Sequence, residues 1–529
     1  MSERLLVVGG GTMGAGIGFV AARAAYDVEI VEPDAGARER AIASLQREAA
    51  RSGDGSALDR IRWRDAIGPS GDVDLAIEAV PERFELKRNV FTELDAELSP
   101  DALIATNTSS LAVADLADVV TNPARVVGLH FFNPPTRMQL IEVVAGPQTS
   151  DETLERAYEA VAKMGKTAVL AADTPGFIVN RIARPYYLQA LRALEDGVAS
   201  AAELDALARG IGFRMGPFEL MDLIGLDVNL ATTESLYART GAERFAPVEL
   251  QRQMVAQGLL GRKSGAGFYS YGDAKLERFE PAVHPTASDR NDDEIVAVVG
   301  FGVRADELAE LLEQRYAVVQ RVVNDDFLDG LSPDATIAVD AGGGDGARDR
   351  GEFITELEAR LGPECVVFVD AYSTDVEASA RRARHPQRLV GYGVLGSLAM
   401  QQIVEIVDSE SVSDDALELA QELFGELGKG VVLLDDVPGL FLGRTIGSVV
   451  NEAIVAVAED VAVPDDVDTA MQLGANYPTG PIALGREVGG ARIARILKRL
   501  AESEGEAFAP HRALWMLDVV EAAPEEALE

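Results

Sequence analysis

The sequence predicts an α/β protein in which a doubly wound sheet is followed by an all-helical C-terminal domain, with this pair of domains duplicated in tandem. Three observations predict it: strand-like apolar runs alternate with helical patterns in the first 172 residues, helices alone follow up to residue 272, and a second strand-to-glycine opening comes after residue 293. With 529 residues, the chain is also too long for one hydrophobic core, because domains usually contain roughly 100–200 residues.

The first segment alternates apolar runs with helical patterns, which is typical of a parallel sheet flanked by helices. Strands are expected at Leu5 to Val8, Val28 to Val31, Leu75 to Val80, Leu103 to Thr106 and Val126 to Phe131, and one helix at Phe84 to Leu94. From Asp173 to Gly272 the pattern is helical, with stops at Gly210, Gly216-Pro217 and Gly225. We therefore expect a sheet domain over residues 1–172 and a helical domain over residues 173–272.

The second half begins after a polar segment without periodicity, residues 273–293, which is typical of a linker. Ile295 to Gly302 then repeats the opening of Leu5 to Gly11. Further matches follow at an offset of 263 residues, as where Gln139 to Val144 recurs as Gln402 to Val407. Several ordered matches indicate a duplication, so we expect a degenerate second sheet domain over residues 294–435 and a second helical domain over residues 436–529.

The composition is strongly acidic, with 87 acidic against 48 basic residues and a formal net charge of −39. Such a surface disfavours nucleic acid and anionic membranes as partners, and because like charges repel each other, the protein should depend on salt to screen them, as halophilic proteins do. We expect no signal peptide and no membrane span, and hence a cytoplasmic location. The lone Cys365 lies in an apolar run and is expected to be a buried core thiol.

A dinucleotide site is predicted by Gly9-Gly10-Gly11-Thr12-Met13-Gly14, which fits G-x-G-x-x-G between a strand and a helix. In a Rossmann fold these glycines allow the tight turn and let a pyrophosphate rest on the helix N-terminus. The next strand ends in Glu32, at the spacing expected for the acid that binds the adenosine ribose. A carboxylate there repels a 2′-phosphate, so NAD is favoured over NADP; these residues alone leave flavin open.

Further motifs follow in the first half: Glu78-Ala79-Val80-Pro81-Glu82, Thr106-Asn107-Thr108-Ser109-Ser110, Gly128-Leu129-His130-Phe131-Phe132-Asn133-Pro134 and Asp173-Thr174-Pro175-Gly176-Phe177-Ile178-Val179-Asn180-Arg181. Together with the glycine loop they resemble the 3-hydroxyacyl-CoA dehydrogenase family over residues 1 to about 272. The resemblance implies NAD as cofactor and an acyl-CoA as substrate.

The resemblance places the catalytic base at His130. A lone His between apolar residues is more often a packed structural residue, and it is the resemblance that reverses this reading. Glu142 lies in an apolar run, and because a buried carboxylate is costly unless paired, we expect a His130–Glu142 dyad; the alternative is a strand-edge Glu that faces water. By resemblance, Ser109 and Asn180 contact the reacting oxygen, and Glu82, Lys87, Asn107 and Lys263 contact the nicotinamide half of the cofactor.

The expected reaction is NAD-dependent oxidation of an L-3-hydroxyacyl-CoA, 3-hydroxybutyryl-CoA or longer, without a metal. Two alternatives stay open: a dehydrogenase of a free hydroxy acid or sugar acid, and a non-catalytic protein that binds NAD or acyl-CoA. In the second half Gly393 stands at the place of His130, and Gly443 at that of Asn180. We therefore expect a structural pseudo-subunit there, and either a monomer with an internal pseudo-dimer or a homodimer.

Overall fold

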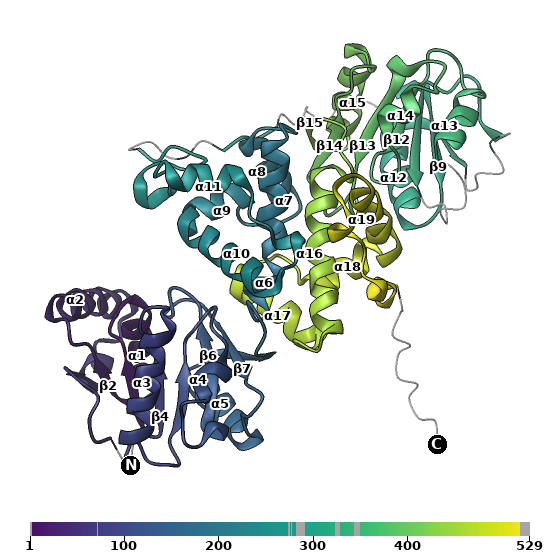
Figure 1. Ribbon diagram of the computed structural model, residues 1–529. Helices are drawn as coiled ribbons and strands as arrows, with labels where there is room; N and C mark the ends of the chain where they lie inside the picture. The colour runs from purple at the N-terminus through teal and green to yellow at the C-terminus, as the bar shows by residue number, and fades with distance from the viewer. Residues whose placement is uncertain are drawn as a thin grey trace, which may run out of the picture. The chain divides into compact units, whose positions relative to one another are not determined.

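The computed structural model describes residues 3–70, 72–272, 276, 278–281, 291–322, 328, 330–342 and 350–518. It divides into two compact units (Figure 1), and each unit contains segments from both halves of the chain. Unit 1 comprises Met1–Ala183, Ala238–Thr240 and Val455–Pro481, and unit 2 comprises Arg184–Tyr237, Gly241–Ile454 and Ile482–Glu529. The predicted linker 273–293 falls mostly outside the described residues. The predicted domain boundaries stay a prediction.

Unit 1 is built on a sheet of eight strands in the order β3-β2-β1-β4-β5-β6-β7-β8. The strands are β1 Arg4–Val8, β2 Asp27–Val31, β3 Ile61–Arg64, β4 Leu75–Glu78, β5 Leu103–Thr106, β6 Val126–Phe131, β7 Leu140–Ala145 and β8 Thr167–Ala172. The five expected strands are present as β1, β2, β4, β5 and β6. Of the other three, β7 coincides with the apolar run that contains Glu142, and the sequence patterns did not predict β3 and β8. The expected parallel sheet is found, with one exception: β6 and β7 pair antiparallel, while the other neighbouring strands pair parallel. Residues 132–139, which join them, are too few for the crossover of about a dozen residues that parallel strands need.

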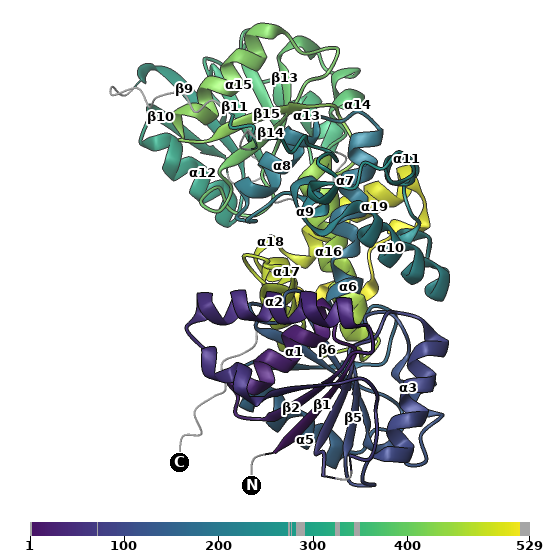
Figure 2. The ribbon, with the colours of Figure 1, turned by 90° about the vertical axis from the view of Figure 1, so that its left-hand side faces the viewer.

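Helices cover both faces of this sheet (Figure 2). One face packs in a single apolar cluster with α1 Thr12–Arg23, α2 Ala35–Ser52 and α5 Asp151–Lys163; α3 Phe84–Glu97 and the short α4 Val113–Ala117 lie on the other. Local signals set the helix starts: Asp34 caps α2 by accepting from the Ala37 N–H, and Ser150 caps α5 by accepting from the Thr153 N–H. Two further helices complete unit 1, α6 Val179–Ile182 and, from the second half of the chain, α17 Pro464–Ala475.

Unit 2 contains a second sheet of seven strands in the order β10-β9-β11-β12-β13-β14-β15. The strands are β9 Asn291–Gly300, β10 Tyr316–Val322, β11 Ile337–Gly342, β12 Val366–Asp370, β13 Leu389–Gly393, β14 Ile403–Val407 and β15 Gly430–Leu434. Around them lie α12 Val303–Glu313, α13 Arg350–Glu358, α14 Val376–Ala380 and α15 Asp414–Glu426. The order repeats that of the first sheet, including one antiparallel pair between β13 and β14. Among the described residues, only β3 has no equivalent.

The helical part of unit 2 draws on both halves of the chain: α7 Arg184–Glu195, α8 Ala201–Gly210, α9 Pro217–Ile224, α10 Leu226–Thr240, α11 Glu249–Ala256, α16 Leu440–Ala458, α18 Pro481–Val488 and α19 Gly490–Glu504. The expected stops are confirmed, since α8 ends at Gly210, α9 starts after Gly216 and Gly225 separates α9 from α10. Arg444, 1% exposed in α16, donates to Gln189 of α7 at 3.0 Å and so joins the two halves.

Short 3₁₀ turns complete the described structure: Gly55–Arg60, Pro123–Arg125, Glu243–Phe245, Arg262–Ser264, Pro386–Arg388, Glu506–Phe508 and Arg512–Leu517. One helix, α16, is long and apolar enough to cross a membrane by length and composition. Because 83% of the apolar window is buried inside the protein, α16 has the surroundings of a core helix.

Candidate active site

The centre of the site is an imidazole–carboxylate pair on neighbouring strands. His130 on β6 and Glu142 on β7 are directly opposite each other in the antiparallel register. Their side chains therefore emerge on the same face of the sheet, and His130 Nδ1 lies 2.5 Å from Glu142 Oε2. His130 is 6% exposed and Glu142 is fully buried. The alternative prediction, that Glu142 is a strand-edge residue facing water, is therefore wrong.

Backbone N–H groups hold the other oxygen of Glu142. Oε1 accepts from Ile178 and Val179 at 3.0 and 2.9 Å, at the start of α6. With three hydrogen bonds, the carboxylate is compensated for its burial and fixed in orientation. Its contact with Nδ1 leaves Nε2 as the ring nitrogen of His130 that can exchange a proton with a substrate, and Nε2 has no hydrogen bond among the described residues.

Aromatic rings hold the imidazole from two sides. The ring of Phe132 lies 4.6 Å from that of His130, centroid to centroid, and the ring of Phe177 lies 5.8 Å away. Both are tilted relative to the imidazole, and Phe177 itself is 1% exposed. Neither Phe was predicted as a site residue, although both are inside the quoted motifs next to His130 and Asn180.

Ser109 lies in the loop after β5, which pairs with β6. The loop is tied to the strand of His130, because Asn107 Oδ1 accepts from the Phe131 N–H at 2.8 Å. The Ser109 N–H donates to Glu82 at 3.0 Å, and its hydroxyl has no hydrogen bond within the described part of the chain. Asn180 follows Val179 directly in α6. Unit 1 thus contains all four residues expected to act on the substrate.

The glycine loop has the close packing that a dinucleotide cradle needs. Gly9 has φ +105°, and a Cβ there would lie 2.7 Å from the Ala79 carbonyl oxygen. A Cβ on Gly14 would lie 1.8 Å from the Gly9 carbonyl oxygen, whereas one on Gly11 would meet nothing within 4 Å. Glycine is therefore required at Gly9 and Gly14 by the chain itself, while the space at Gly11 is open for a ligand.

Glu32 stands directly beside this loop. Its Oε2 accepts from the Gly10 N–H at 2.9 Å, and its Oε1 accepts from the Asp34 N–H at 3.1 Å. The carboxylate is thus held just after β2, against the loop that leads into α1 at Thr12. The loop, the helix N-terminus and the acid together fit NAD, the first by its backbone and the last by its charge.

A groove of about 520 Å³ leads away from the loop. It is lined by Gly10, Gly11, Thr12, Ala15, Gly16, Ala37, Arg40, Ala41, Ser44, Leu45, Arg47, Glu48, Pro134, Pro135 and Thr136. Its size lies within the range of small-molecule sites. Two arginines of α2, Arg40 and Arg47, bring positive charge to a strongly acidic protein at this place, and the sequence alone did not indicate them.

Lys87 is buried rather than free to meet a ligand. The side chain of Lys87 is 1% exposed. Its Nζ lies 2.8 and 3.0 Å from the two carboxylate oxygens of Glu78 and 3.2 Å from Oε2 of Glu82. Burial raises the pKa of Glu78 although Lys87 opposes this. For Glu82, burial acts upward, but Lys87 and the nearby hydroxyls hold its pKa below the usual value.

Sequence reasoning missed Glu78 as a site residue. Its position was the available signal, since it ends β4 at the ligand-binding edge of the sheet. Through Lys87 it fixes Glu82, whose Oε1 accepts from the N–H groups of Ser109 and Ser110, both at 3.0 Å. The last predicted cofactor residue, Lys263, belongs to unit 2, where it is ion-paired with Asp227.

The second sheet has the carboxylate of the pair but not the imidazole. Gly393 pairs with Glu405 in the register that His130 and Glu142 have. Glu405 Oε1 accepts from the N–H groups of Phe441 and Leu442 at 2.8 and 2.9 Å, and its Oε2 accepts from the Tyr372 hydroxyl. The hydroxyl of Tyr372 therefore contacts Glu405 as the imidazole of His130 contacts Glu142.

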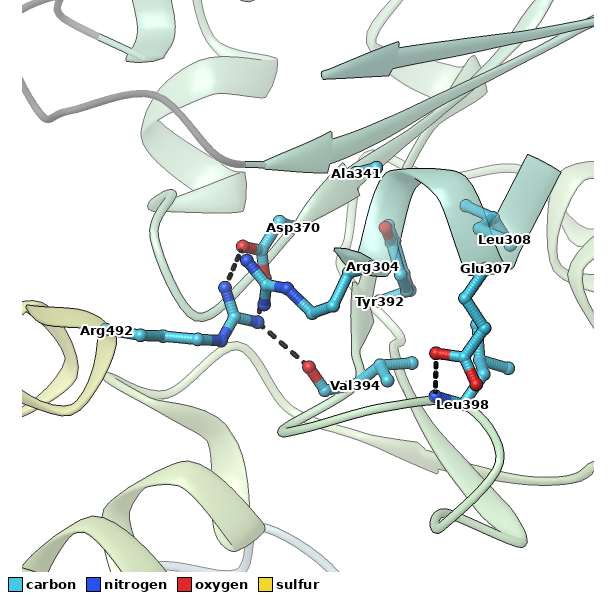
Figure 3. Close-up of a pocket in the computed structure, with 9 residues that line it drawn as sticks. All are labelled: Arg304, Glu307, Leu308, Ala341, Asp370, Tyr392, Val394, Leu398 and Arg492. Atoms are coloured by element: carbon cyan, nitrogen blue, oxygen red, sulfur yellow. Dashed lines mark hydrogen bonds and ion pairs between the residues drawn. The ribbon is translucent and has the colours of Figure 1, made fainter. Parts of the chain in front are cut away.

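Beside it, Arg492 forms a bidentate ion pair with Asp370 at 2.6 and 3.0 Å, facing Arg304 (Figure 3). The cavity between them measures only about 20 Å³, room for a single water molecule. The second copy thus has neither an imidazole opposite Glu405 nor a space of substrate size at this place.

A glycine loop with a carboxylate beside it and an imidazole–carboxylate pair at the carboxyl edge of the same sheet are the features expected of an NAD-dependent oxidoreductase. Comparison with known families agrees. Residues 4–174 match the 3-hydroxyacyl-CoA dehydrogenase NAD binding domain, and residues 176–271 and 439–524 both match the 3-hydroxyacyl-CoA dehydrogenase C-terminal domain.

The chain is 36% identical over 516 residues to 3-hydroxyadipyl-CoA dehydrogenase of Escherichia coli (strain K12), covering 95% of this chain and 94% of that one. The crystal structure of a 3-hydroxybutyryl-CoA dehydrogenase from Escherichia coli K12 matches with a TM-score of 0.78 and 33% identity, covering 98% of both chains. A probable 3-hydroxybutyryl-CoA dehydrogenase of Deinococcus radiodurans is 38% identical over 274 residues, which is 50% of this chain and 99% of the relative. The chain belongs to the 3-hydroxyacyl-CoA dehydrogenase family and is an NAD-dependent enzyme.

Proposed function

We propose that this chain oxidises an L-3-hydroxyacyl-CoA to the 3-oxoacyl-CoA with His130 as the general base. The observation that supports this most directly is the 2.5 Å contact of His130 Nδ1 with the buried Glu142. An imidazole that is oriented by a carboxylate on one nitrogen and open on the other is arranged to take a proton from a substrate hydroxyl group.

In this reaction His130 Nε2 takes the proton of the 3-hydroxyl group while C3 loses a hydride and becomes a carbonyl carbon. Bound NAD supplies the acceptor for that hydride. Glu142 keeps the proton of His130 on Nδ1 and stabilises the imidazolium ion that forms. We further propose that the Ser109 hydroxyl and the Asn180 amide hold the 3-oxygen next to His130.

For the cofactor, we propose that Gly9, Gly11, Thr12, Met13 and Gly14 hold the pyrophosphate and that Glu32 binds the adenosine ribose. We assign the nicotinamide half to Glu82, Asn107 and Lys263, with Lys87 included through its hold on Glu82. The open space at Gly11 and the fixed carboxylate of Glu32 support this assignment.

The substrate is proposed to be a CoA ester rather than a free acid. The names of the relatives point to acyl-CoA substrates, and Arg40 and Arg47 bring cations to the groove beside the glycine loop. Guanidinium groups are well suited to phosphates, which a CoA ester carries and a free hydroxy acid lacks. We also propose a cytoplasmic enzyme whose second half acts as an internal pseudo-subunit.

The base is tested by following NADH consumption with acetoacetyl-CoA in molar salt. Replacing His130 by Gln should lower kcat by about a thousandfold, the middle of the range for loss of a general base. His385→Gln is the matched control, because this His lies in the second half and its side chain caps nothing. Wild-type rates in the His130 variant would refute the role of His130. A folded wild-type chain without turnover would instead favour a non-catalytic binding protein.

The substrate class is tested with acetoacetyl-CoA against free acetoacetate. We expect turnover of the ester only, and an Arg40→Gln, Arg47→Gln double variant should raise the KM for the ester about tenfold, as loss of charge-assisted phosphate contacts does. If the double variant raises only the KM for NADH, these arginines serve the cofactor. Equal turnover of free acetoacetate would establish the alternative of a free-acid dehydrogenase.

A further inference from the structure

Helix α17 comes from the second half of the chain but packs against the first sheet within unit 1 (Figure 1). The segment that leads into it is bound to β8, since the Val461 carbonyl accepts from the Ala172 N–H at 2.8 Å. Asp466 in the first turn of α17 accepts from the Leu170 N–H at 3.1 Å. Helix α17 thus lies at the β8 edge of the sheet, and it also contacts β7 and α6.

The C-terminal end of α17 lies against the residues that surround the His130–Glu142 pair. A Cβ on Gly474 would lie 2.7 Å from Leu140 Cδ2, 2.9 Å from Val179 Cγ2 and 3.4 Å from Phe132 Cζ. Phe132 packs on the imidazole at 4.6 Å, and the Val179 N–H donates to Glu142 at 2.9 Å. Leu140 precedes Glu142 by two residues on β7. Gly474 thus lies against Phe132, which packs on His130, and against Val179, which donates to Glu142.

Unit 2 contains the reciprocal arrangement. There α8, from the first half, packs against β14, with a Cβ on Gly210 lying 3.0 Å from Ile403 Cβ. The Gln402 N–H donates to the Gly210 carbonyl at 2.7 Å. Gly210 and Ile403 are the repeat partners of Gly474 and Leu140. The two copies have exchanged equivalent helices, but the copy that α8 supports has Gly393 where the base would be.

We propose that α17 is a positioning element of the first copy's active site, so that the second copy, although it lacks a base, sets the geometry of the His130–Glu142 pair. Protein interiors are close-packed, and a displaced neighbour therefore displaces what rests on it. Glycine at position 474 allows α17 to approach Leu140 and Val179 this closely. The inference rests on the proposed role of the pair and adds a function for the second half.

The test compares Gly474→Ala with Gly210→Ala in the full chain. Both add one methyl group to an exchanged helix at a tight contact, so both should lower Tm by a few degrees. Only Gly474→Ala should lower kcat, by about tenfold, because small displacements of a reacting group already slow catalysis. Adding Leu140→Val, which shortens the opposing side chain, should restore most of the lost rate.

A second measurement follows the NMR signals of the His130 imidazole and does not depend on turnover. The chain has four histidines, so the His130 ring signals can be identified in NMR spectra by their loss in His130→Gln. We expect Gly474→Ala to move these signals and Gly210→Ala to leave them in place. The proposal is overturned if Gly474→Ala leaves both kcat and the His130 signals unchanged, or if the two glycine variants alter them equally. An inactive wild-type chain would overturn the proposed function, while the NMR comparison would still decide the role of α17.

Discussion

At the scale of single residues, the two copies hold equivalent carboxylates, Glu142 and Glu405, in the same way but pair them with different side chains. Glu142 and Glu405 are both fully buried and both accept from two consecutive N–H groups. Glu142 has an imidazole as its third partner, and Glu405 has the Tyr372 hydroxyl. Burial raises the pKa of Glu405 to about 7, against the hydrogen bonds from Tyr372 and the backbone.

The raised pKa of Glu405 makes stability depend on pH. The folded chain binds the proton at about pH 7, whereas the ordinary value for Glu is 4.5. This contribution to stability is therefore present below about pH 4.5 and is lost as the pH rises through 7. Between these limits the wild type should lose about 3 kcal/mol relative to Glu405→Gln, which cannot titrate. Urea unfolding of both proteins at several pH values and constant ionic strength measures the difference. Parallel curves would contradict it.

The prediction that Cys365 is a buried core thiol is confirmed. The thiol is 5% exposed, and burial raises its pKa to about 12. A thiolate is the reactive form of cysteine, so this side chain is inert at neutral pH and belongs to the core of the second sheet domain.

At the scale of elements, the glycine loops of the two copies differ at several positions, among them that of the third glycine. Gly14 of α1 corresponds to Ala305 of α12, counting from Gly9 and Gly300. In the first copy no Cβ fits, because it would lie 1.8 Å from the Gly9 carbonyl oxygen. The second copy carries the methyl group of Ala305 at this position, so the close contact of Gly14 with Gly9 cannot form there in the same way.

Gly14→Ala should therefore weaken NADH binding by tenfold or more, because the backbone of the loop must move to admit the methyl group. Fluorescence titration with NADH measures this directly. Gly447→Ala is the control, since in α16 the nearest atom to an added Cβ lies at 3.5 Å, an ordinary contact. Unchanged affinity in Gly14→Ala would show that the loop does not bind the cofactor.

At the scale of the whole molecule, the net charge of −39 opposes folding at low ionic strength. Raising salt from 0.1 M to 1 M shortens the screening length from about 10 Å to about 3 Å. We expect Tm to rise by roughly 10 °C over this range, as the release of several kcal/mol of repulsion would do. Differential scanning calorimetry in KCl, with sucrose as the uncharged control, tests this. An equal rise in sucrose would mean that screening is not the cause.

Much of the fold follows from local patterns. Alternating apolar runs predicted five strands of the first sheet, and matches such as that of Gln139 to Val144 with Gln402 to Val407 predicted the second. The strand β3 was missed because Arg62 and Arg64 interrupt its apolar pattern. The strand β8 was missed because three of its six residues are alanine, which is depleted in strands. Both strands lie at the edges of the sheet, where one side of the strand faces away from the core and polar residues are tolerated.

The sequence by itself determined the chemical inventory: the glycine loop, Glu32, and an imidazole and a carboxylate on successive apolar runs. Only the tertiary structure decided that β6 and β7 run antiparallel and thus bring His130 opposite Glu142. It also decided that Lys87 is buried against Glu78 and that α17 packs on the first sheet. Periodicity reports which residues are buried, but which partner buries them depends on chain reversals and long-range packing, and these leave no local signature in the sequence.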